Sequence, residues 1–403
     1  MPEFTSKASS KLVGHRPTWA QIDLDALAAN FQIVRKLVGP QIKIMAVVKA
    51  NAYGHGAAHC ARRLAAEGTD WFGVASPEEG IELRQAGITQ PILCLGGFWE
   101  GQASACLQHQ LVPVVYRLDM LEALDQAARV AGVVADVHVK IDTGMGRLGV
   151  RFDQVSEFAG SLQRFQNTRI DGLMTHLAAA DDRSCEPLTI NQVARFNSAT
   201  EAFRTHGLIP VYEHLANSAG TFDQPAAWGN MVRPGGVLYG LWRDVLPPLK
   251  QTSETSMHLY ADAKPRFQAV MSLRSRITLL KWVPQGETIG YGCTYEASRR
   301  TLVATLPIGY HDGYMRNLSN RGRVIVRNSY ASVIGRVSMD LTLIDVSNVS
   351  DVELGDVVTL LGPDSVQGGP SIHAEDFART AGTLSYEVTC GISNRVPRIY
   401  LPE

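Results

Sequence analysis

A lysine followed by small residues and glycines forms the chemically most suggestive segment of the chain. The segment reads Ala46-Val-Val-Lys49-Ala-Asn-Ala-Tyr53-Gly-His-Gly56. Lys49 closes an apolar run that we predict to be a strand, and the glycines after it let a bulky ligand approach the backbone. A lysine whose ammonium is removed from water can lose its proton and form a Schiff base with a carbonyl compound. A lysine that merely reaches from a strand end into solvent is the alternative for Lys49 taken alone.

Eight short apolar runs alternate with helical patterns over the first 240 residues. The runs are nearly continuous, as expected for parallel strands that are covered on both faces. The predicted strands are 42–48, 71–76, 91–97, 111–116, 135–143, 169–178, 211–218 and 231–240, and the helical patterns include 77–86, 119–131, 153–165 and 188–206. Eight such units favour an α/β fold of the (β/α)8 (TIM) barrel type over an open doubly wound sheet. Lys49 then lies at the carboxyl ends of the strands, where barrel active sites form.

The pattern changes after residue 241. The dipeptide Pro247–Pro248 and a polar stretch at 251–256 indicate a linker. Short strands follow at 268–283, 301–308, 323–327, 332–346 and 356–361, and a helical pattern at 373–381 ends at Gly382, which is expected to be its C-cap. We therefore predict a flexible leader at 1–14, the barrel at 15–250 and a mostly β domain at 256–403.

The composition narrows the class of protein. With 403 residues, 45% of them hydrophobic, the chain can build two domains with a large core. Lys plus Arg number 38 against 39 for Asp plus Glu, so the net charge of -1 gives no electrostatic case for binding nucleic acid or an anionic membrane. No apolar run reaches the roughly 18 residues of a membrane helix, and residues 1–10 lack the apolar stretch of a secretory signal. Six scattered cysteines, none in a C-x-x-C pair, predict reduced thiols in a cytoplasmic protein.

The lysine segment resembles the pyridoxal-phosphate motif of alanine racemases. Similar motifs follow in the same order through almost the whole chain, and although each is weak alone, the ordered set is specific. They are Val139-Lys-Ile-Asp-Thr-Gly-Met-Gly-Arg147-Leu-Gly, Thr175-His-Leu-Ala, His214-Leu-Ala-Asn-Ser218-Ala-Gly, Met231-Val-Arg-Pro-Gly-Gly, Gly290-Tyr-Gly, Pro307-Ile-Gly-Tyr310, Gly335-Arg-Val-Ser-Met339-Asp and Leu384-Ser-Tyr-Glu-Val. The resemblance implies a barrel followed by a β domain, pyridoxal 5'-phosphate as cofactor, and a homodimer whose active sites draw residues from both subunits.

The resemblance places the cofactor phosphate at the ends of the seventh and eighth predicted strands. Ser218 and the amides of Gly235 and Gly236 end these strands, and a phosphate needs several such donors. Tyr53 and Tyr386 match family tyrosines whose hydroxyls can add to the cofactor site. The residues alone leave open a tight turn for the two glycines and a core aromatic side chain for Tyr386.

Arg233 bears on the type of reaction. The resemblance places its guanidinium against the pyridine nitrogen of the cofactor. Because an arginine keeps its proton at working pH, the ring nitrogen should stay unprotonated and become a weaker electron sink. Barrel decarboxylases that use this cofactor are similar in the first domain but have an acid at the matching position, so Arg233 favours racemisation. A structural arginine paired with a nearby acid is the alternative.

Racemisation needs a proton removed from one face of the substrate Cα and one returned on the other, which two bases on opposite faces can do. The resemblance makes Lys49 one base and Tyr291 of a second subunit the other. Tyrosine has an ordinary pKa of about 10, so it needs cationic help to act as a base at neutral pH. His176 matches the family histidine that helps, together with a nearby arginine. From spacing alone, Tyr291 is an aromatic residue in a glycine-flanked turn.

The other predicted site residues bind or guide the substrate. Arg147 and Met339 match positions that hold the substrate carboxylate, through the guanidinium and a backbone N–H respectively. Lys140 matches a lysine that is often N-carboxylated in relatives, and such a carbamate would orient Arg147; an unmodified strand lysine is the alternative. Tyr310 and Asp181 would line the entryway for the substrate.

Some residues depart from the family pattern, and two histidines have the spacing of a metal site. Ser338 replaces a common cysteine, His311 a common alanine and Asn394 a common tyrosine, which bears on the shape of the entrance and on strict preference for alanine. His55 and His59 have the i, i+4 spacing of a metal-binding pair. They lack the glutamate of H-E-x-x-H and an obvious third ligand, so no metal is predicted.

The predicted function is a racemase that interconverts L-alanine and D-alanine, which would supply peptidoglycan if the source is bacterial. The first alternative is a broad-specificity racemase for serine or basic amino acids. A non-catalytic pyridoxal-phosphate carrier would lack the second domain, and Arg233 disfavours a barrel decarboxylase. The expected partners are a small amino acid and a second copy of the chain, without nucleic acid or membrane.

Overall fold

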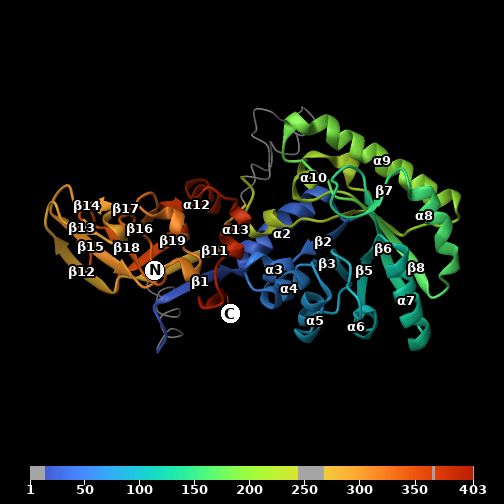
Figure 1. Ribbon diagram of the computed structural model, residues 1–403, viewed down its shortest axis with the longest axis horizontal. Helices are drawn as coiled ribbons and strands as arrows, with labels where there is room; N and C mark the ends of the chain where they lie inside the picture. Colours follow the sequence, from blue (N-terminus) through green and yellow to red (C-terminus); the bar gives the residue numbers. More distant parts are fainter. Residues whose placement is uncertain (1–13, 244–266, 365–367, 403) are drawn as a thin grey trace. The chain divides into compact units, whose positions relative to one another are not determined.

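The computed structural model describes residues 14–243, 267–364 and 368–402 (Figure 1). Within these residues the chain forms two units. Unit 1 contains residues up to Ala26, the short segment Tyr53–His55 and the chain from Ala269 onward, whereas unit 2 contains Leu27–Ala52 and Gly56–Gln268. The predicted leader, except for Gly14, and the predicted domain boundary at 250–256 lie outside the described residues.

Unit 2 contains the predicted barrel of eight parallel strands. They are β2 (Lys43–Val47), β3 (Trp71–Val74), β4 (Ile92–Cys94), β5 (Leu111–Val115), β6 (Ala135–Asp142), β8 (Thr168–Met174), β9 (Tyr212–His214) and β10 (Met231–Val232), and they pair in the order β10-β2-β3-β4-β5-β6-β8-β9. The first and last strands of this series are also joined, because Asn230 N donates to Glu213 O and Arg233 N donates to Ala216 O, both at 3.0 Å. The prediction of a (β/α)8 barrel is confirmed.

Helices cover the outer side of these strands (Figure 1). They are α2 (Leu24–Val38), α4 (Ala57–Ala66), α5 (Pro77–Gln85), α6 (Ala103–Gln108), α7 (Leu118–Ala131), α8 (Val155–Ser161), α9 (Glu186–Thr205) and α10 (Ser218–Asp223). In α7 the buried residues are Met120, Leu121, Leu124 and Ala128, the spacing of an apolar stripe on one helix face. Gly132 ends the helix in the left-handed conformation.

The barrel interior is filled by large side chains from different strands. Met45, Trp71, Leu93, Val114, Met174 and Met231 form one buried cluster, against which Tyr116 and Tyr212 also pack. Burying such side chains stabilises the fold by about 1.5–3 kcal/mol each. The interior is therefore a packed core, and ligands must bind at an end of the barrel.

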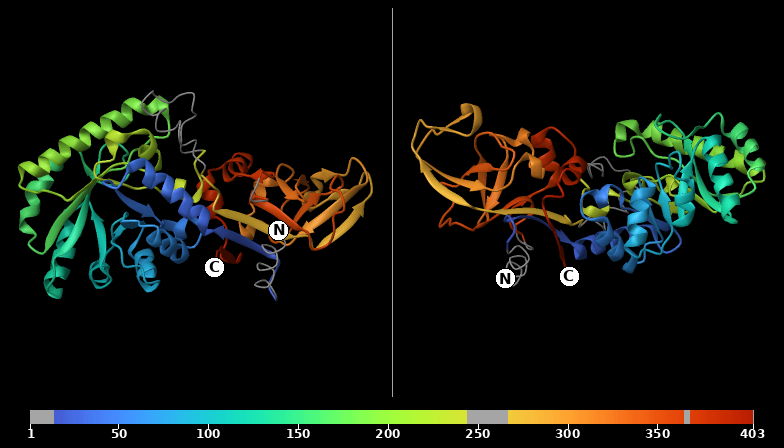
Figure 2. Two further views of the ribbon diagram at one scale, coloured as in Figure 1. Left: turned by 180° about the vertical axis from the view of Figure 1, so that it is seen from behind. Right: turned by 60° about the horizontal axis from the view of Figure 1, so that its bottom comes forward.

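Unit 1 is mostly β structure, as predicted. Its main sheet contains β1 (Thr18–Asp23), β11 (Met271–Arg276), β12 (Leu279–Val283), β15 (Thr301–Leu306), β16 (Arg323–Val326), β17 (Ser329–Val333), β18 (Thr342–Asp345), β19 (Val357–Pro363), β20 (Ser371–Ile372) and β21 (Arg398–Leu401). A small hairpin, β13 (Thr288–Ile289) with β14 (Tyr295–Glu296), is separate from it. The orange strands follow a curve in both views of Figure 2.

Two details of the β unit differ from the expectation. The predicted strand 268–283 is two strands, β11 and β12, separated at Ile277. Residues 18–23, which the predicted range 15–250 placed with the barrel, form β1 in the sheet of unit 1, where Thr18 pairs with Ser275 and Ile22 with Met271. A strand that pairs with residues some 250 positions away gives no local signal of its partner, so the sequence pattern could not assign it.

Two helices complete the description of unit 1. They are α12 (Ala374–Ala381), which Gly382 ends with φ 77° as predicted, and α13 (Ser385–Cys390). None of the helices in the described ranges has the length and apolar character needed to span a bilayer. The six cysteines are all free thiols, and Cys60, Cys94 and Cys106 are buried.

Candidate active site

Lys49 follows the first barrel strand and begins a turn of unusual handedness. The strand ends at Val47, whose carbonyl accepts a hydrogen bond from the Tyr239 hydroxyl at 2.9 Å. The three residues after Lys49 have φ values of 52°, 53° and 54°, so the backbone winds as a left-handed turn. This conformation costs roughly 1–2 kcal/mol per residue. Such strain persists where surrounding contacts hold it, commonly at functional sites.

Two acceptors hold this turn. Asn51 Oδ1 accepts from Ala57 N at 2.8 Å, and Glu79 Oε1, from α5, accepts from Ala50 N at 2.8 Å. The bonds fix the backbone on both sides of the turn. Lys49 is thereby held, half-buried, at the carboxyl end of β2.

Lys140 points from β6 into surroundings that are buried and positively charged. Its side chain is 5% exposed. Burial, followed by the charges of Arg147, Arg233 and Lys49, lowers the pKa of Lys140 to about 8. About half of this amine is therefore uncharged near pH 8. Because the charges of Arg147, Arg233 and Lys49 affect the pKa of Lys140, these four basic side chains lie in one region. Three of them come from the ends of barrel strands and one from a loop.

Arg147 lies in a loop whose backbone is held by hydrogen bonds to the carboxylate of Asp142. Asp142 Oδ1 accepts from Gly144 N at 3.0 Å and from Gly146 N at 3.1 Å. Gly149 has φ 133°, and a Cβ at this position would lie 2.4 Å from Asp142 N, so the loop requires a glycine here. The Arg147 side chain is exposed.

His176 follows β8 and is positioned from α9. Gln192, fully buried, donates to His176 O and to Thr143 Oγ1, both at 3.0 Å. Burial, followed by the charge of Arg233, lowers the pKa of His176 well below its ordinary value. His176 is therefore a neutral imidazole at neutral pH.

Arg233 follows β10 and is buried, with 4% of its surface exposed. Its Nη1 donates to His214 Nδ1 at 2.9 Å and to His214 O at 2.8 Å, and its Nη2 donates to Thr175 O at 2.6 Å and Leu215 O at 2.9 Å. Nη2 also lies 3.4 Å from His176 Nδ1. None of the described acids forms an ion pair with Arg233, so the alternative of an acid-paired structural arginine is not supported. Burial lowers its pKa to about 9.

A row of buried polar side chains leads away from Arg233, and it was not predicted from the sequence. His214 Nε2 lies 2.8 Å from His138 Nδ1, and His138 Nε2 lies 3.8 Å from Asp171 Oδ2. All three residues are buried. They come from β9, β6 and β8, and His214 was seen only as part of a motif. A histidine inside an otherwise apolar strand run is the signal that singles out His138.

The predicted phosphate site is locally consistent. Ser218 begins α10, and its Oγ accepts from Gly235 N at 2.9 Å. Gly236 begins a 3-10 helix, Gly236–Tyr239. The first N–H groups of a helix have no acceptor within the helix, so these two starts offer donors to an anion. The serine and both glycines are thus brought together.

In unit 1, Tyr53 lies beside Tyr386, with ring centroids 5.6 Å apart. Between Tyr53 and His55, Gly54 has φ 85°, and a Cβ there would lie 2.1 Å from Thr389 O in α13. Only glycine allows this close approach. The two tyrosines that the resemblance assigns to the cofactor are therefore neighbours in the fold.

Tyr291 is 73% exposed and lies in a short turn. Gly290 and Gly292 on either side have φ values of 78° and 71°, which favour glycine. A Cβ on Gly292 would lie 2.9 Å from Nη1 of Arg336, so a guanidinium is close to this turn. A tyrosine held this far into solvent by its own chain has no packing role in the described unit.

Met339 and Tyr310 lie in two loops of unit 1 that contact each other. Tyr310 N donates to Ser338 O at 3.0 Å, and His311 N donates to Met339 O at 3.1 Å. Met339 is 52% exposed, and no acceptor in the described ranges faces its N–H. Asp181, the other predicted entryway residue, is exposed in unit 2.

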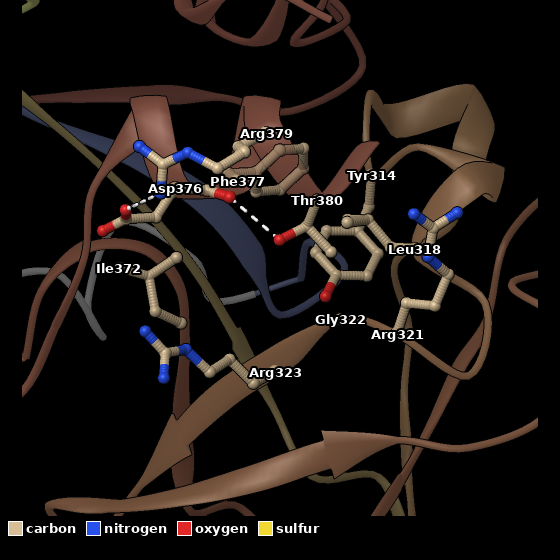
Figure 3. Close-up of a pocket in the computed structure, with 10 residues that line it drawn as sticks. All are labelled: Tyr314, Leu318, Arg321, Gly322, Arg323, Ile372, Asp376, Phe377, Arg379 and Thr380. Carbon is tan, nitrogen blue, oxygen red and sulfur yellow. Dashed lines mark hydrogen bonds and ion pairs between the residues drawn. The ribbon is translucent and has the colours of Figure 1, made fainter. Parts of the chain in front are cut away.

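Two further observations on the described residues concern other possible binding sites. The described residues contain no group of three or more His, Cys, Asp or Glu side chains that could hold a metal ion, and His55 Nδ1 lies 2.9 Å from Tyr53 O. A pocket in unit 1 is lined by the buried rings of Tyr314 and Phe377 and by three arginines (Figure 3). None of the predicted site residues lines this pocket.

Comparisons with known proteins agree over almost the whole chain. Residues 22–242 match the family model "Alanine racemase, N-terminal domain", and residues 270–400 match "Alanine racemase, C-terminal domain". The alanine racemase of Citrifermentans bemidjiense is 43% identical over 391 residues, which are 96% of this chain and 99% of the relative. That of Geobacter sulfurreducens is 44% identical over 388 residues, 96% and 97% of the two chains.

Solved structures lead to the same result. The alanine racemase of Clostridium difficile 630 has a TM-score of 0.86 at 35% identity and covers 96% of both chains. The alanine racemase of Bacillus anthracis with bound L-Ala-P has a TM-score of 0.86 at 30% identity, again covering 96% of both. These matches confirm the resemblance of the motifs. The chain belongs to the alanine racemase family.

Proposed function

We propose that the protein interconverts L-alanine and D-alanine with pyridoxal 5'-phosphate as cofactor. The observation that carries the proposal is the concentration of basic groups at one end of the barrel. Lys49, Lys140, Arg147 and Arg233 all act on the pKa of His176 there. Such a region attracts both the anionic cofactor and the carboxylate of an amino acid.

The residues fit the cofactor by their chemistry. The Ser218 hydroxyl and the N–H groups near Gly235 and Gly236 would hold the phosphate, with Tyr53 and Tyr386 as further donors, and Lys49 would bind the aldehyde carbon. When bound, the cofactor makes the Cα–H of the amino acid acidic by withdrawing electrons from it. The buried guanidinium of Arg233 would face the pyridine nitrogen and donate to it without giving up its proton. This limits electron withdrawal and favours racemisation over decarboxylation.

Two bases would move the proton. The Lys49 amine would take or return it on one face of the Cα, and the Tyr291 hydroxyl on the other. Because Tyr291 is 73% exposed in its own unit, we assign it to the site of a second copy of the chain, which makes the active form a homodimer. The guanidinium near its turn, or Arg147, would supply the positive charge that a tyrosine base needs.

Lys140 would act through Arg147. Its lowered pKa of about 8 leaves part of the amine uncharged and able to add carbon dioxide, which forms a carbamate anion and releases one proton to solvent. A carbamate anion among these cations would orient the Arg147 guanidinium toward the substrate carboxylate. The free N–H of Met339 would bind the same carboxylate, and Tyr310 and Asp181 would line the entryway.

A cytoplasmic enzyme of this kind would supply D-alanine for peptidoglycan in a bacterium. The test is chiral chromatography after cofactor-loaded protein is incubated with single L-amino acids: alanine, serine, lysine, arginine and glutamate. We expect conversion of alanine well above the others. Similar rates for serine or basic amino acids would replace the assignment with a broad-specificity racemase. Bound cofactor without inversion of any amino acid would contradict racemisation altogether.

A further inference from the structure

Arg233 is a buried cation without a directly bonded carboxylate among the described residues. Its four shortest hydrogen bonds go to three carbonyl oxygens and to His214 Nδ1. Removing a charge from water costs several kcal/mol unless it is compensated. The contacts that lead from the guanidinium through His214 and His138 end near a carboxylate, that of Asp171.

The direction of these contacts follows from the chemistry of arginine. A guanidinium only donates, so His214 Nδ1 must accept and His214 must carry its proton on Nε2. This Nε2–H then donates to His138 Nδ1 at 2.8 Å, which leaves the proton of His138 on its own Nε2. That nitrogen lies 3.8 Å from Asp171 Oδ2, too far for a hydrogen bond, so the carboxylate favours the N–H at this position through its charge. Any other pair of neutral tautomers brings two N–H groups or two lone pairs face to face.

Both rings are held as neutral imidazoles in a space built for them. Burial is the largest cause that lowers the pKa of His138 and, well below its ordinary value, that of His214. The His138 ring packs against Trp71 and Tyr212, with centroids 5.2 and 5.8 Å away, and these two rings also contact each other. A Cβ on Gly172 would lie 2.6 Å from His138 Cε1, so a residue next to Asp171 in β8 leaves the room for this ring.

A purely structural role explains this arrangement poorly. The surrounding cluster is apolar, and buried polar networks can often be replaced by apolar side chains of the same volume without loss of stability. The row instead ends on the residue that faces the cofactor in the proposed function. It contains a cation at one end, a carboxylate at the other and two rings of defined orientation between them.

We propose that His138 and Asp171 are positioning residues, which fix the tautomer of His214 and thereby hold the Arg233 guanidinium in the orientation that meets the pyridine nitrogen. The inference rests on the proposed function. Removing the charge of Asp171 frees His138 to bind its proton on either nitrogen. His214 can then present an N–H to Arg233, and one of the bonds that orient the guanidinium is lost.

The test combines a spectroscopic and a kinetic measurement on the full chain. Nitrogen-15 NMR of histidine-labelled protein, before and after addition of pyridoxal phosphate, reports which ring nitrogen of His214 and His138 carries the proton; signals are assigned with the His138→Phe and His214→Phe variants. We expect Nε2–H in both rings of the unaltered protein and a mixture of tautomers for His214 in Asp171→Asn. The turnover number for alanine should fall about 10- to 100-fold, by analogy with the loss of residues that orient metal-bound histidines, with little change in KM.

The matched control is Asp153→Asn, which removes an exposed carboxylate that pairs with Arg151 at 2.9 Å on the same unit. It should leave both measurements unchanged. An Nδ1–H form of His214 in the unaltered protein would overturn the proposal without any variant. So would unchanged tautomers and turnover in Asp171→Asn. A third outcome is that both histidines have the expected tautomers but the unaltered protein does not racemise alanine. In that case the proposed function is wrong, whereas the proposed roles of His138 and Asp171 in orienting His214 and Arg233 still hold.

Discussion

Lys140 and Arg233 of the barrel differ in burial from Tyr291 and Met339 of the β-rich unit, although all four belong to the proposed active site. In the barrel, Lys140 and Arg233 are 5% and 4% exposed, and hydrogen bonds within the barrel fix their surroundings. In unit 1, Tyr291 and Met339 are 73% and 52% exposed, and only the backbone of their loops is held. The barrel therefore prepares Lys140 and Arg233 by itself, whereas its Arg147 is exposed. The exposed groups of unit 1 become useful only when another surface faces them, which is the physical basis for proposing a homodimer.

The largest expected effect comes from removing the barrel lysine. Lys49→Ala should lower turnover at least about 1,000-fold, because the nucleophilic amine and one of the two bases are lost together. The visible absorbance that develops when the protein binds pyridoxal phosphate should be lost as well. Chiral chromatography and absorbance spectra measure the two effects. Lys36→Ala, an exposed lysine in α2, is the control, and substantial turnover by Lys49→Ala would refute the assignment.

The exposed tyrosine of unit 1 should matter nearly as much. Tyr291→Phe should lower racemisation about 100- to 10,000-fold, equally in both directions because the equilibrium constant is one. Exchange of the Cα proton with deuterated water should persist for one enantiomer, the one that Lys49 deprotonates. Loss of exchange for both enantiomers would contradict the two-base assignment.

Mixing the two variants sharpens the comparison between the units. In a mixed dimer of Lys49→Ala and Tyr291→Phe, one site lacks both groups, whereas the other combines an intact lysine with an intact tyrosine. Activity should therefore return to a substantial fraction of normal after subunits are exchanged. If both groups belonged to one chain, mixing would restore nothing.

A smaller effect is expected for Lys140. Lys140→Met should raise KM about 10-fold, since Arg147 loses the group that orients it. In the unaltered protein, carbon-13 NMR with labelled bicarbonate should show a carbamate signal that Lys140→Met lacks. The unmodified amine binds its proton less well in the folded chain, with the pKa lowered from 10.5 to about 8. Stability should thus rise with pH between these values in carbon dioxide-free buffer, and the carbamate should remove this rise.

The smallest effect concerns the space behind Arg233. Gly172→Ala would place a methyl group against the His138 ring and should destabilise the protein by about 1–3 kcal/mol, the usual cost of overpacking. Denaturant unfolding measures the loss. Gly160→Ala in α8, where the nearest atom to a Cβ is 3.3 Å away on His206, is the comparison and should destabilise far less, because alanine also favours a helix over glycine by about 0.5–1 kcal/mol. Equal stability of the two variants would mean that the ring moves without cost.

Much of the fold was predictable because its signals are local. All eight barrel strands were found, since continuous apolar runs between helical patterns repeat along the chain. β1 was misplaced because its partners, β11 and β21, are distant in sequence. The split of 268–283 into two strands was missed because the apolar pattern continues through the break.

The candidate site was predictable only where a motif carried it. Lys49, Arg233 and the two glycines stand in recognisable segments, whereas Asp171 and His138 are single residues whose meaning depends on three strands meeting. The neutral state of His176 was likewise not predictable, because it results from burial and from cations that come from other parts of the chain. Spacing shows which residues are present, but the charge that each one bears is set by its neighbours in space.

The left-handed turn after Lys49 has a consequence for the chirality of the chain itself. Ala50 has φ 52° and ψ 49°, a conformation that costs an L-residue roughly 1–2 kcal/mol and that its mirror image prefers. Because Ala50 is exposed, a semisynthetic chain with D-alanine at this position should keep its contacts and gain about 1 kcal/mol of stability. The protein would then contain, in its own backbone, the enantiomer that its proposed reaction makes.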